Sequence, residues 1–243
     1  MKRPALYRIP LCRAPLCSRW LASAVLAAGL AATPAWATTT SYTGQASFLG
    51  DAGIVTTTNF DSIAVNTLFT AGTGPAGSGF TLSGIIGGGL TPMVANTYGT
   101  TSGSNYLGLN STPSVNSDTQ FASGDVLTFS FTGSNAFGFF VVGGSDLSAG
   151  DIQLSFGGTD FLTAGLATNL GGGNFAYFLG LVSDTVQTSA TVSGLGTFAL
   201  FALDDVSINN PGGGGGGNQV PEPTSLALVG LALVAARVAR RRA

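Results

Sequence analysis

Apolar and polar residues alternate with a period of two over long stretches of this chain. Residues 127–132 alternate Leu, Phe and Phe with Thr, Ser and Thr, and residues 152–156 repeat the pattern with Ile, Leu and Phe. Similar runs cover residues 80–86, 136–142, 175–182, 186–192 and 197–208. Clusters rich in Gly, Ser and Asn separate them at 133–135, 143–145, 157–158 and 194–196. Many short strands with regular turn signals predict an all-β, antiparallel β-sandwich of the jelly-roll type.

Phenylalanine supplies the large apolar side chains of these predicted strands. The core is therefore expected to contain Phe129, Phe131, Phe137, Phe139, Phe140, Phe156, Phe198 and Phe201. The two tryptophans, Trp20 and Trp36, both precede the first predicted strand.

The first 37 residues have the pattern of an export signal. Basic residues come first (Lys2, Arg3, Arg8, Arg13 and Arg19), and an apolar run follows at 21–32. Ala35 and Ala37 then form a small-x-small cleavage site, so we expect signal peptidase to cut after Ala37 once the secretion translocon has engaged the leader. Both cysteines, Cys12 and Cys17, lie in this leader, so the mature chain would have neither disulfides nor thiol chemistry.

The C-terminal end carries a second apolar segment with a different flank. The motif Val220, Pro221, Glu222 and Pro223 precedes an apolar run at 226–236, and the cluster Arg237, Arg240, Arg241 and Arg242 follows it. This order predicts an extended entry, a short transmembrane helix and an arginine stop on the cytoplasmic side. A helix over 224–239 spans roughly 24 Å, whereas the hydrocarbon core is about 30 Å thick, so it makes a marginal permanent anchor.

This three-part tail resembles the PEP-CTERM sorting signal of Gram-negative bacteria. The resemblance implies that exosortase, a membrane-embedded enzyme like a cysteine transpeptidase, cuts near the motif and delivers the protein to the cell surface or extracellular matrix. The expected organisation is then a signal peptide (1–37), a β-sandwich passenger domain (38–210), a Gly-rich linker (211–219) and the sorting tail (220–243). The protein would be held only transiently in the inner membrane. The alternative is an ordinary anchor that is never processed.

The mature segment has no positively charged side chain. Residues 38–236 contain no Lys, Arg, His or Cys, and Glu222 is the only glutamate among the eleven acidic residues, so ten aspartates remain. Nucleic-acid and anionic-lipid binding both need cations and are excluded for this segment. Nucleophilic catalysis lacks a histidine or lysine base, and zinc lacks its preferred ligands. Paired carboxylates, as in glycoside hydrolases, remain possible. No pair stands out, so we expect a non-catalytic protein.

Two aspartates interrupt the last predicted strand. Strict alternation places Asp204 on one face with Val206 and Ile208, where a buried carboxylate needs a partner. Calcium is then a candidate counter-ion. The stretches 203–208 and 59–62 also resemble segments of jelly-roll carbohydrate-binding modules, which implies that Asp61, Asp204 and Asp205 hold a structural calcium. Alternatively, Asp204 and Asp205 cap turns or accept backbone N–H bonds at a strand end.

A polar stretch at 98–110 could bind a sugar through Tyr98 and Tyr106, because sugars stack on aromatic rings. The alternative is a flexible surface loop. Three functions therefore follow from the sequence. The first is a surface or matrix protein linked to exopolysaccharide or biofilm, the second is a calcium-stabilised carbohydrate-binding module, and the third is a secreted glycoside hydrolase.

Overall fold

The computed structural model describes residues 38–83, 90–110, 120–145, 147–163, 167–197 and 200–209. Several predictions fall on residues outside these ranges. They are the signal peptide, the cleavage-site alanines, the linker, the sorting motif, the transmembrane helix, the arginine stop and the core residue Phe198. Within the described ranges, no helix is both long and apolar enough to cross a membrane.

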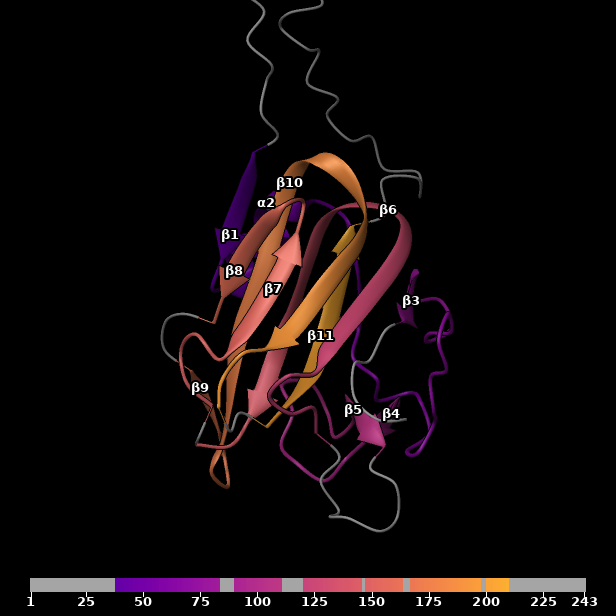
Figure 1. Ribbon diagram of the computed structural model, residues 1–243, viewed down its shortest axis with the longest axis vertical. Helices are drawn as coiled ribbons and strands as arrows, with labels where there is room; N and C mark the ends of the chain where they lie inside the picture. Colours follow the sequence, from indigo (N-terminus) through magenta and orange to yellow (C-terminus); the bar gives the residue numbers. More distant parts are fainter. Residues whose placement is uncertain are drawn as a thin grey trace, which may run out of the picture. The chain divides into compact units, whose positions relative to one another are not determined.

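One helix and eleven strands make up the described domain (Figure 1). They are β1 (Thr39–Tyr42), α2 (Gln45–Ala52), β2 (Val55–Thr58), β3 (Phe80–Ser83), β4 (Thr91–Ala95), β5 (Tyr106–Asn110), β6 (Val126–Gly143), β7 (Ile152–Phe156), β8 (Thr159–Leu162), β9 (Thr168–Gly171), β10 (Asn174–Gly194) and β11 (Phe201–Asn209). All the pairings between these strands are antiparallel. The predicted all-β, antiparallel class is therefore confirmed.

The strands join into one open sheet with the order β4-β5-β11-β6-β10-β7-β8, and β1, β2, β3 and β9 pair at its sides. Two long strands, β6 and β10, give this single sheet a sandwich-like form. The rings of Phe129 and Phe137 lie on the same strand, yet their centroids are 4.9 Å apart. Eight residues of straight strand would separate them by about 26 Å, so β6 folds back on itself.

The strand β10 bends beside β6. Its pairing with β6 shifts register between Val182 and Gln187, where Gln187 pairs with Ser134. Figure 1 shows both strands arching over at the same end of the domain. The predicted turn at 133–135 is therefore a bend inside a continuous strand, because hydrogen bonds to β10 continue through it.

The main core lies between the two legs of these bent strands. Phe137 is fully buried, and its ring packs against those of Phe129, Phe131, Phe139 and Phe156. The predicted core is confirmed for every described phenylalanine except Phe140, which is half-buried. The buried phenylalanines are Phe129, Phe131, Phe137, Phe139, Phe156 and Phe201.

The outer face of the sheet carries a second, smaller apolar cluster under α2. Phe48 of α2 packs against Phe178, with 5.4 Å between the ring centroids, and Phe140 packs against the ring of Phe178 as well. The paired residues Gly138 and Gly180 lie directly beneath. A Cβ atom at Gly180 would come within 2.6 Å of Phe48, so the helix can dock only because both strands lack side chains there.

Candidate functional site

A bulge in β11 positions the two consecutive aspartates. Asp204 pairs with Phe140 and Ser207 with Gly138, so β11 has one residue more than β6 between these pairs. Asp205 takes the left-handed backbone conformation, with φ of 49°. An extra residue reverses the alternation of a strand beyond it.

This bulge corrects the face predicted for Asp204. Leu203, Val206 and Ile208 all belong to the main core, whereas Ala202 belongs to a cluster on the outer face. Asp204 therefore shares its face with Ala202 and not with Val206 and Ile208. The side chain is nonetheless fully buried, because the loop before β5 covers it.

That loop, residues 100–105, is held at one end by Asp204 and is called here the acid-bound loop. The Asp204 carboxylate accepts hydrogen bonds from the backbone N–H of Thr101 at 2.9 Å and of Ser102 at 3.1 Å. Both residues also donate their hydroxyl groups to it, at 2.8 and 3.1 Å. The Asp205 N–H adds a further bond at 2.8 Å. Five donor groups thus converge on one carboxylate.

Asp61 holds the other end of the acid-bound loop. Its Oδ1 accepts the backbone N–H groups of Ser104 at 2.8 Å and Asn105 at 3.0 Å. Asn105 in turn donates its Nδ2 to the carbonyl of Ile63 at 3.0 Å. A side chain at Gly103 would overlap the Asp61 carboxylate, so a substitution there would push Asp61 away from the loop. The Thr101 hydroxyl also lies 3.0 Å from Oδ2 of Asp205. The three aspartates singled out in the sequence therefore all contact this loop.

The surroundings of Asp204 and Asp205 disfavour the ionised form of their carboxyl groups. Burial raises the pKa of Asp204 from 3.8 to about 6, and the neighbouring charge of Asp205 adds to the rise, while hydrogen bonds from Thr101 and Asp205 lower it in part. Burial also raises the pKa of Asp205, and the charge of Asp61 contributes. No Lys, Arg or His exists in this part of the sequence to balance these charges.

The acid-bound loop suits calcium in chemistry but not in spacing. Carboxylate oxygens and the backbone carbonyl oxygens of a loop are ligands that calcium takes. Across the described residues, however, no three His, Cys, Asp or Glu side chains lie close enough together to hold a metal ion. The oxygens of Asp204 accept N–H and O–H donors instead. This is the arrangement of the alternative interpretation, in which the aspartates accept backbone N–H bonds.

The two tyrosines proposed for sugar binding lie against each other beside this loop. Tyr106 is fully buried and packs with Met93 and Ala202, so its ring cannot stack on a sugar. Tyr98 is half-buried, with its ring centroid 6.2 Å from that of Tyr106. In the described part of the domain every aromatic ring is buried or half-buried. Neither this pair nor any other described ring provides an exposed platform on which a sugar could stack.

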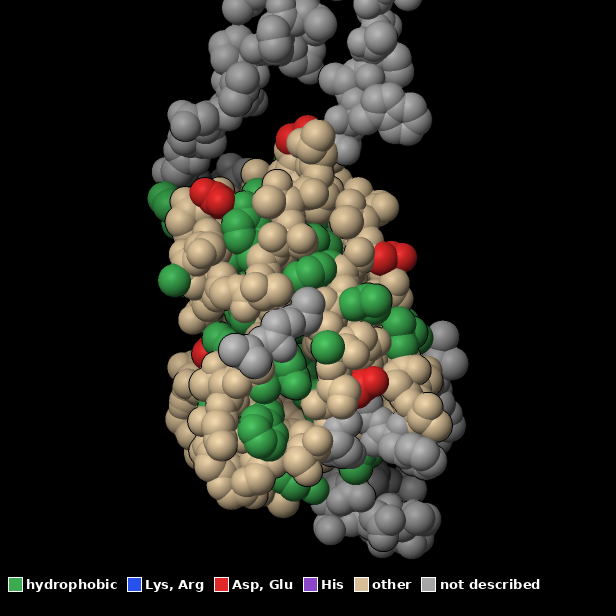
Figure 2. Space-filling model, turned by 90° about the vertical axis from the view of Figure 1, so that its left-hand side faces the viewer, with side chains coloured by type: hydrophobic (Ala, Val, Ile, Leu, Met, Phe, Trp, Pro, Cys, Tyr) green, Lys and Arg blue, Asp and Glu red, His purple; other side chains and the backbone are tan. Residues whose placement is uncertain are grey.

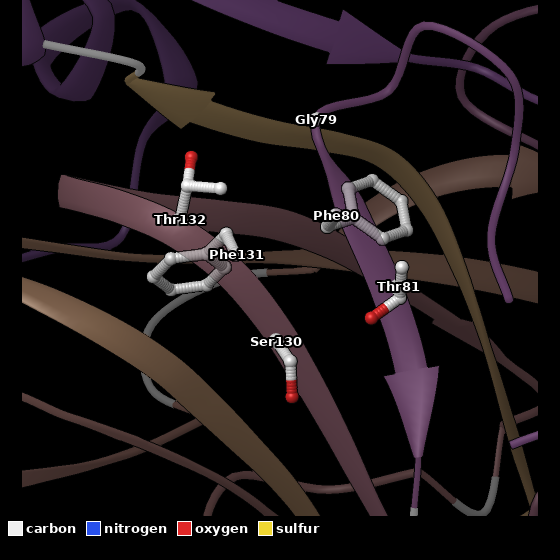
Figure 3. Close-up of a pocket in the computed structure, with 6 residues that line it drawn as sticks. All are labelled: Gly79, Phe80, Thr81, Ser130, Phe131 and Thr132. Atoms are coloured by element: carbon white, nitrogen blue, oxygen red, sulfur yellow. The ribbon is translucent and has the colours of Figure 1, made fainter. Parts of the chain in front are cut away.

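An open hollow of about 420 Å³ lies over the pairing of β3 and β6. It is lined by Gly79, Phe80, Thr81, Ser130, Phe131 and Thr132. Figure 3 shows Phe80 and Phe131 on adjacent strands, with the hydroxyl groups of Thr81 and Ser130 beside them. The lining has no titratable group, so this hollow cannot perform acid–base chemistry.

Acidic side chains are otherwise dispersed. Figure 2 shows them scattered over one face of the domain rather than gathered into a patch. Several of them have structural hydrogen bonds, since Asp51 accepts from Tyr42, Asp125 from the Ala122 N–H, and Asp160 from Ser155.

Sequence reasoning missed the partners of the aspartates. The donors Thr101, Ser102 and Ser104 lie in the stretch considered as a flexible loop or a sugar site. Three short hydroxyl residues around Gly103 were the available signal, because such residues readily hydrogen-bond carboxylates. Their pairing with Asp61 and Asp204 spans 43 and 102 or more residues of sequence, which local patterns do not report.

Together, the fold and the loop define a small acidic all-β domain without cationic side chains. Residues 219–243 match the PEP-CTERM protein-sorting motif. The match covers about a tenth of the chain and confirms the resemblance of the tail. The chain is thus an exported protein targeted to exosortase. No curated protein matches the chain, so the likeness of the domain to carbohydrate-binding modules rests on two short stretches alone.

Proposed function

We propose that the chain is a non-catalytic cell-surface or extracellular-matrix protein, delivered by the sorting motif and associated with the exopolysaccharide of its own cell. The observation that carries the proposal is the motif match at residues 219–243. A signal peptide cut after Ala37 would release the domain on the outer side of the membrane. The helix over 224–239 and its arginines would hold the protein until exosortase acts near Pro221.

The described domain supports a structural role rather than catalysis. Its most perturbed carboxylate, Asp204, is buried beneath the acid-bound loop and accepts five donors, so it is shielded from a substrate. The hollow beside Phe80 and Phe131 has no acid or base. A glycosidase needs two carboxyl groups facing a scissile bond, about 5–9.5 Å apart. Asp204 is fully buried and therefore cannot face such a bond.

Polysaccharide binding without turnover is the expected behaviour of the exported chain. The purified protein should co-sediment with exopolysaccharide from the same cells and should release no reducing ends from it over hours. The measurement combines a sedimentation assay with a reducing-sugar assay, and an unrelated neutral polysaccharide is the control. Release of reducing ends above the protein-free blank would show a hydrolase instead.

A second candidate is the calcium-stabilised carbohydrate-binding module. One observation favours it, namely the meeting of Asp61, Asp204 and Asp205 on one loop without any cation. If calcium bound, these three would supply carboxylate oxygens, and the ion would neutralise their charges. The acid-bound loop would first have to turn its N–H donors away from Asp204.

Calcium is not expected to stabilise the hydrogen-bonded arrangement. The melting temperature of the exported chain at pH 7.5 should be the same in millimolar calcium and in excess chelator. Calorimetry is the measurement, with magnesium as the matched control. A ligand at 100 times its Kd stabilises a protein by about 2.7 kcal/mol, so a calcium-specific rise of several degrees would favour the second candidate.

A further inference from the structure

The first described residue, Thr38, is held by a carboxylate on a distant strand. Its backbone nitrogen donates to Oδ2 of Asp184 at 2.9 Å, and its hydroxyl donates to the same oxygen at 3.0 Å. In return, the Asp184 N–H donates to the Thr38 carbonyl at 3.1 Å. The next residue, Thr39, pairs with Ser183 as the start of β1 on β10. The ladder between β1 and β10 thus extends to Thr38.

Thr38 is also the residue that the leader sequence predicts as the new N-terminus. Signal peptidase would hydrolyse the bond between Ala37 and Thr38, so that water supplies a hydroxyl to the Ala37 carbonyl and a hydrogen to the Thr38 nitrogen. The resulting amine takes up a proton near neutral pH, because α-amino groups have a pKa of about 7.7–8.0. The nitrogen that already donates to Asp184 would then carry a full positive charge.

We propose that Asp184 is the receptor for the mature N-terminus, and that cleavage after Ala37 completes an ion pair between the Thr38 ammonium and the Asp184 carboxylate. The inference rests on the proposed export route. Residues 38–209 contain no Lys, Arg or His, so this ammonium is the only cation the domain can offer to its ten aspartates. An ammonium has three N–H donors and keeps the hydrogen bond that the amide nitrogen makes.

The order of events follows from the same contacts. In the folded domain, Thr38 is bound to Asp184 and Thr39 is paired with Ser183, so the mature side of the Ala37–Thr38 bond is not free to enter a protease. Signal peptidase therefore acts before β1 docks on β10. Docking of the charged end then fixes this edge of the sheet, which would otherwise present unpaired backbone groups of β10.

The ion pair can be probed directly by amine labelling. The only lysine of the full sequence, Lys2, lies in the leader, so the exported chain has no lysine. After cleavage, the α-amine is the only primary amine, so an N-hydroxysulfosuccinimide ester can acylate a single site. Only the neutral amine reacts, and the ion pair favours the charged form. At pH 7 and low salt, Asp184→Asn should be acylated about two- to fivefold faster than the wild type, the range for an exposed pair. Mass spectrometry counts the added group.

The matched control is Asp160→Asn. Asp160 is exposed on β8 and accepts a hydrogen bond from Ser155 rather than from Thr38, so this variant should label at the wild-type rate. In the wild type alone, raising the salt to 0.5 M should speed labelling toward the Asp184→Asn rate, because salt screens exposed pairs. Equal rates for wild type and Asp184→Asn, or no salt effect, would overturn the ion pair while leaving the export route intact. An N-terminal residue other than Thr38, read by terminal sequencing, would overturn both the cleavage site and this inference.

Discussion

The exported chain is expected to be more stable in mild acid than at neutral pH, and Asp204 is expected to be the main cause. The folded pKa of Asp204 is about 6, above its unfolded value of 3.8, so the folded state binds the proton more tightly. The stability that Asp204 contributes is therefore fully present below pH 4 and is lost as the pH rises through about 6. The shift corresponds to about 3 kcal/mol in total. Between pH 4.5 and 7.5 the loss from this group alone should be about 2 kcal/mol.

Replacing Asp204 with Asn isolates this contribution. The amide cannot ionise, so the difference in unfolding free energy between pH 4.5 and 7.5 should shrink by about 2 kcal/mol. A smaller slope of the same sign should remain, because burial also raises the pKa values of Asp125 and Asp205. Urea unfolding at the two pH values is the measurement. Asp160→Asn removes the same formal charge from an exposed position and is the control. An unchanged slope in Asp204→Asn would mean that the buried carboxylate carries no charge penalty.

The sequence predicted the strands of this domain better than their connections. Period-two alternation at 127–132 and 136–142 gave the right faces, because apolar side chains must reach one core. It could not show that both runs belong to β6, since Gly133, Ser134 and Asn135 allow a bend as readily as a turn. A bend differs from a turn here because β10 continues to pair with β6 on both sides of it. Pairing between segments distant in sequence leaves no local sequence signal.

The candidate site was predicted by residue type and missed in its geometry. The sequence predicted that a buried carboxylate in the last strand needs a partner, and Asp204 is indeed hydrogen-bonded by the acid-bound loop. Its face was predicted wrongly because one residue in the left-handed conformation, Asp205, reverses the alternation. Asp adopts the left-handed conformation more readily than most residues, but an Asp in a strand does not by itself indicate a bulge. The burial of Tyr106 was missed for a related reason, since a tyrosine serves equally well in a core or at a surface.

Replacement of the sorting motif should abolish processing of the tail and release of the protein from the inner membrane. Replacing Pro221, Glu222 and Pro223 together with alanine removes the rigid entry and the acid while leaving the apolar run and the arginines unchanged. We expect this variant to stay in the inner-membrane fraction with its full tail. Replacing the three linker residues Gly213, Gly214 and Gly215 with serine is the control and should leave processing unchanged, because both sequences form flexible linkers. Normal release of the motif variant would show that the tail is not read as a sorting signal.

The intact mass of the native protein collected from the cell surface tests the account most directly. A chain that begins at Thr38 and ends near Pro221, with or without an added group at that end, is the predicted result. A mass that retains Arg237, Arg240, Arg241 and Arg242 would contradict exosortase processing and would identify the tail as a permanent anchor.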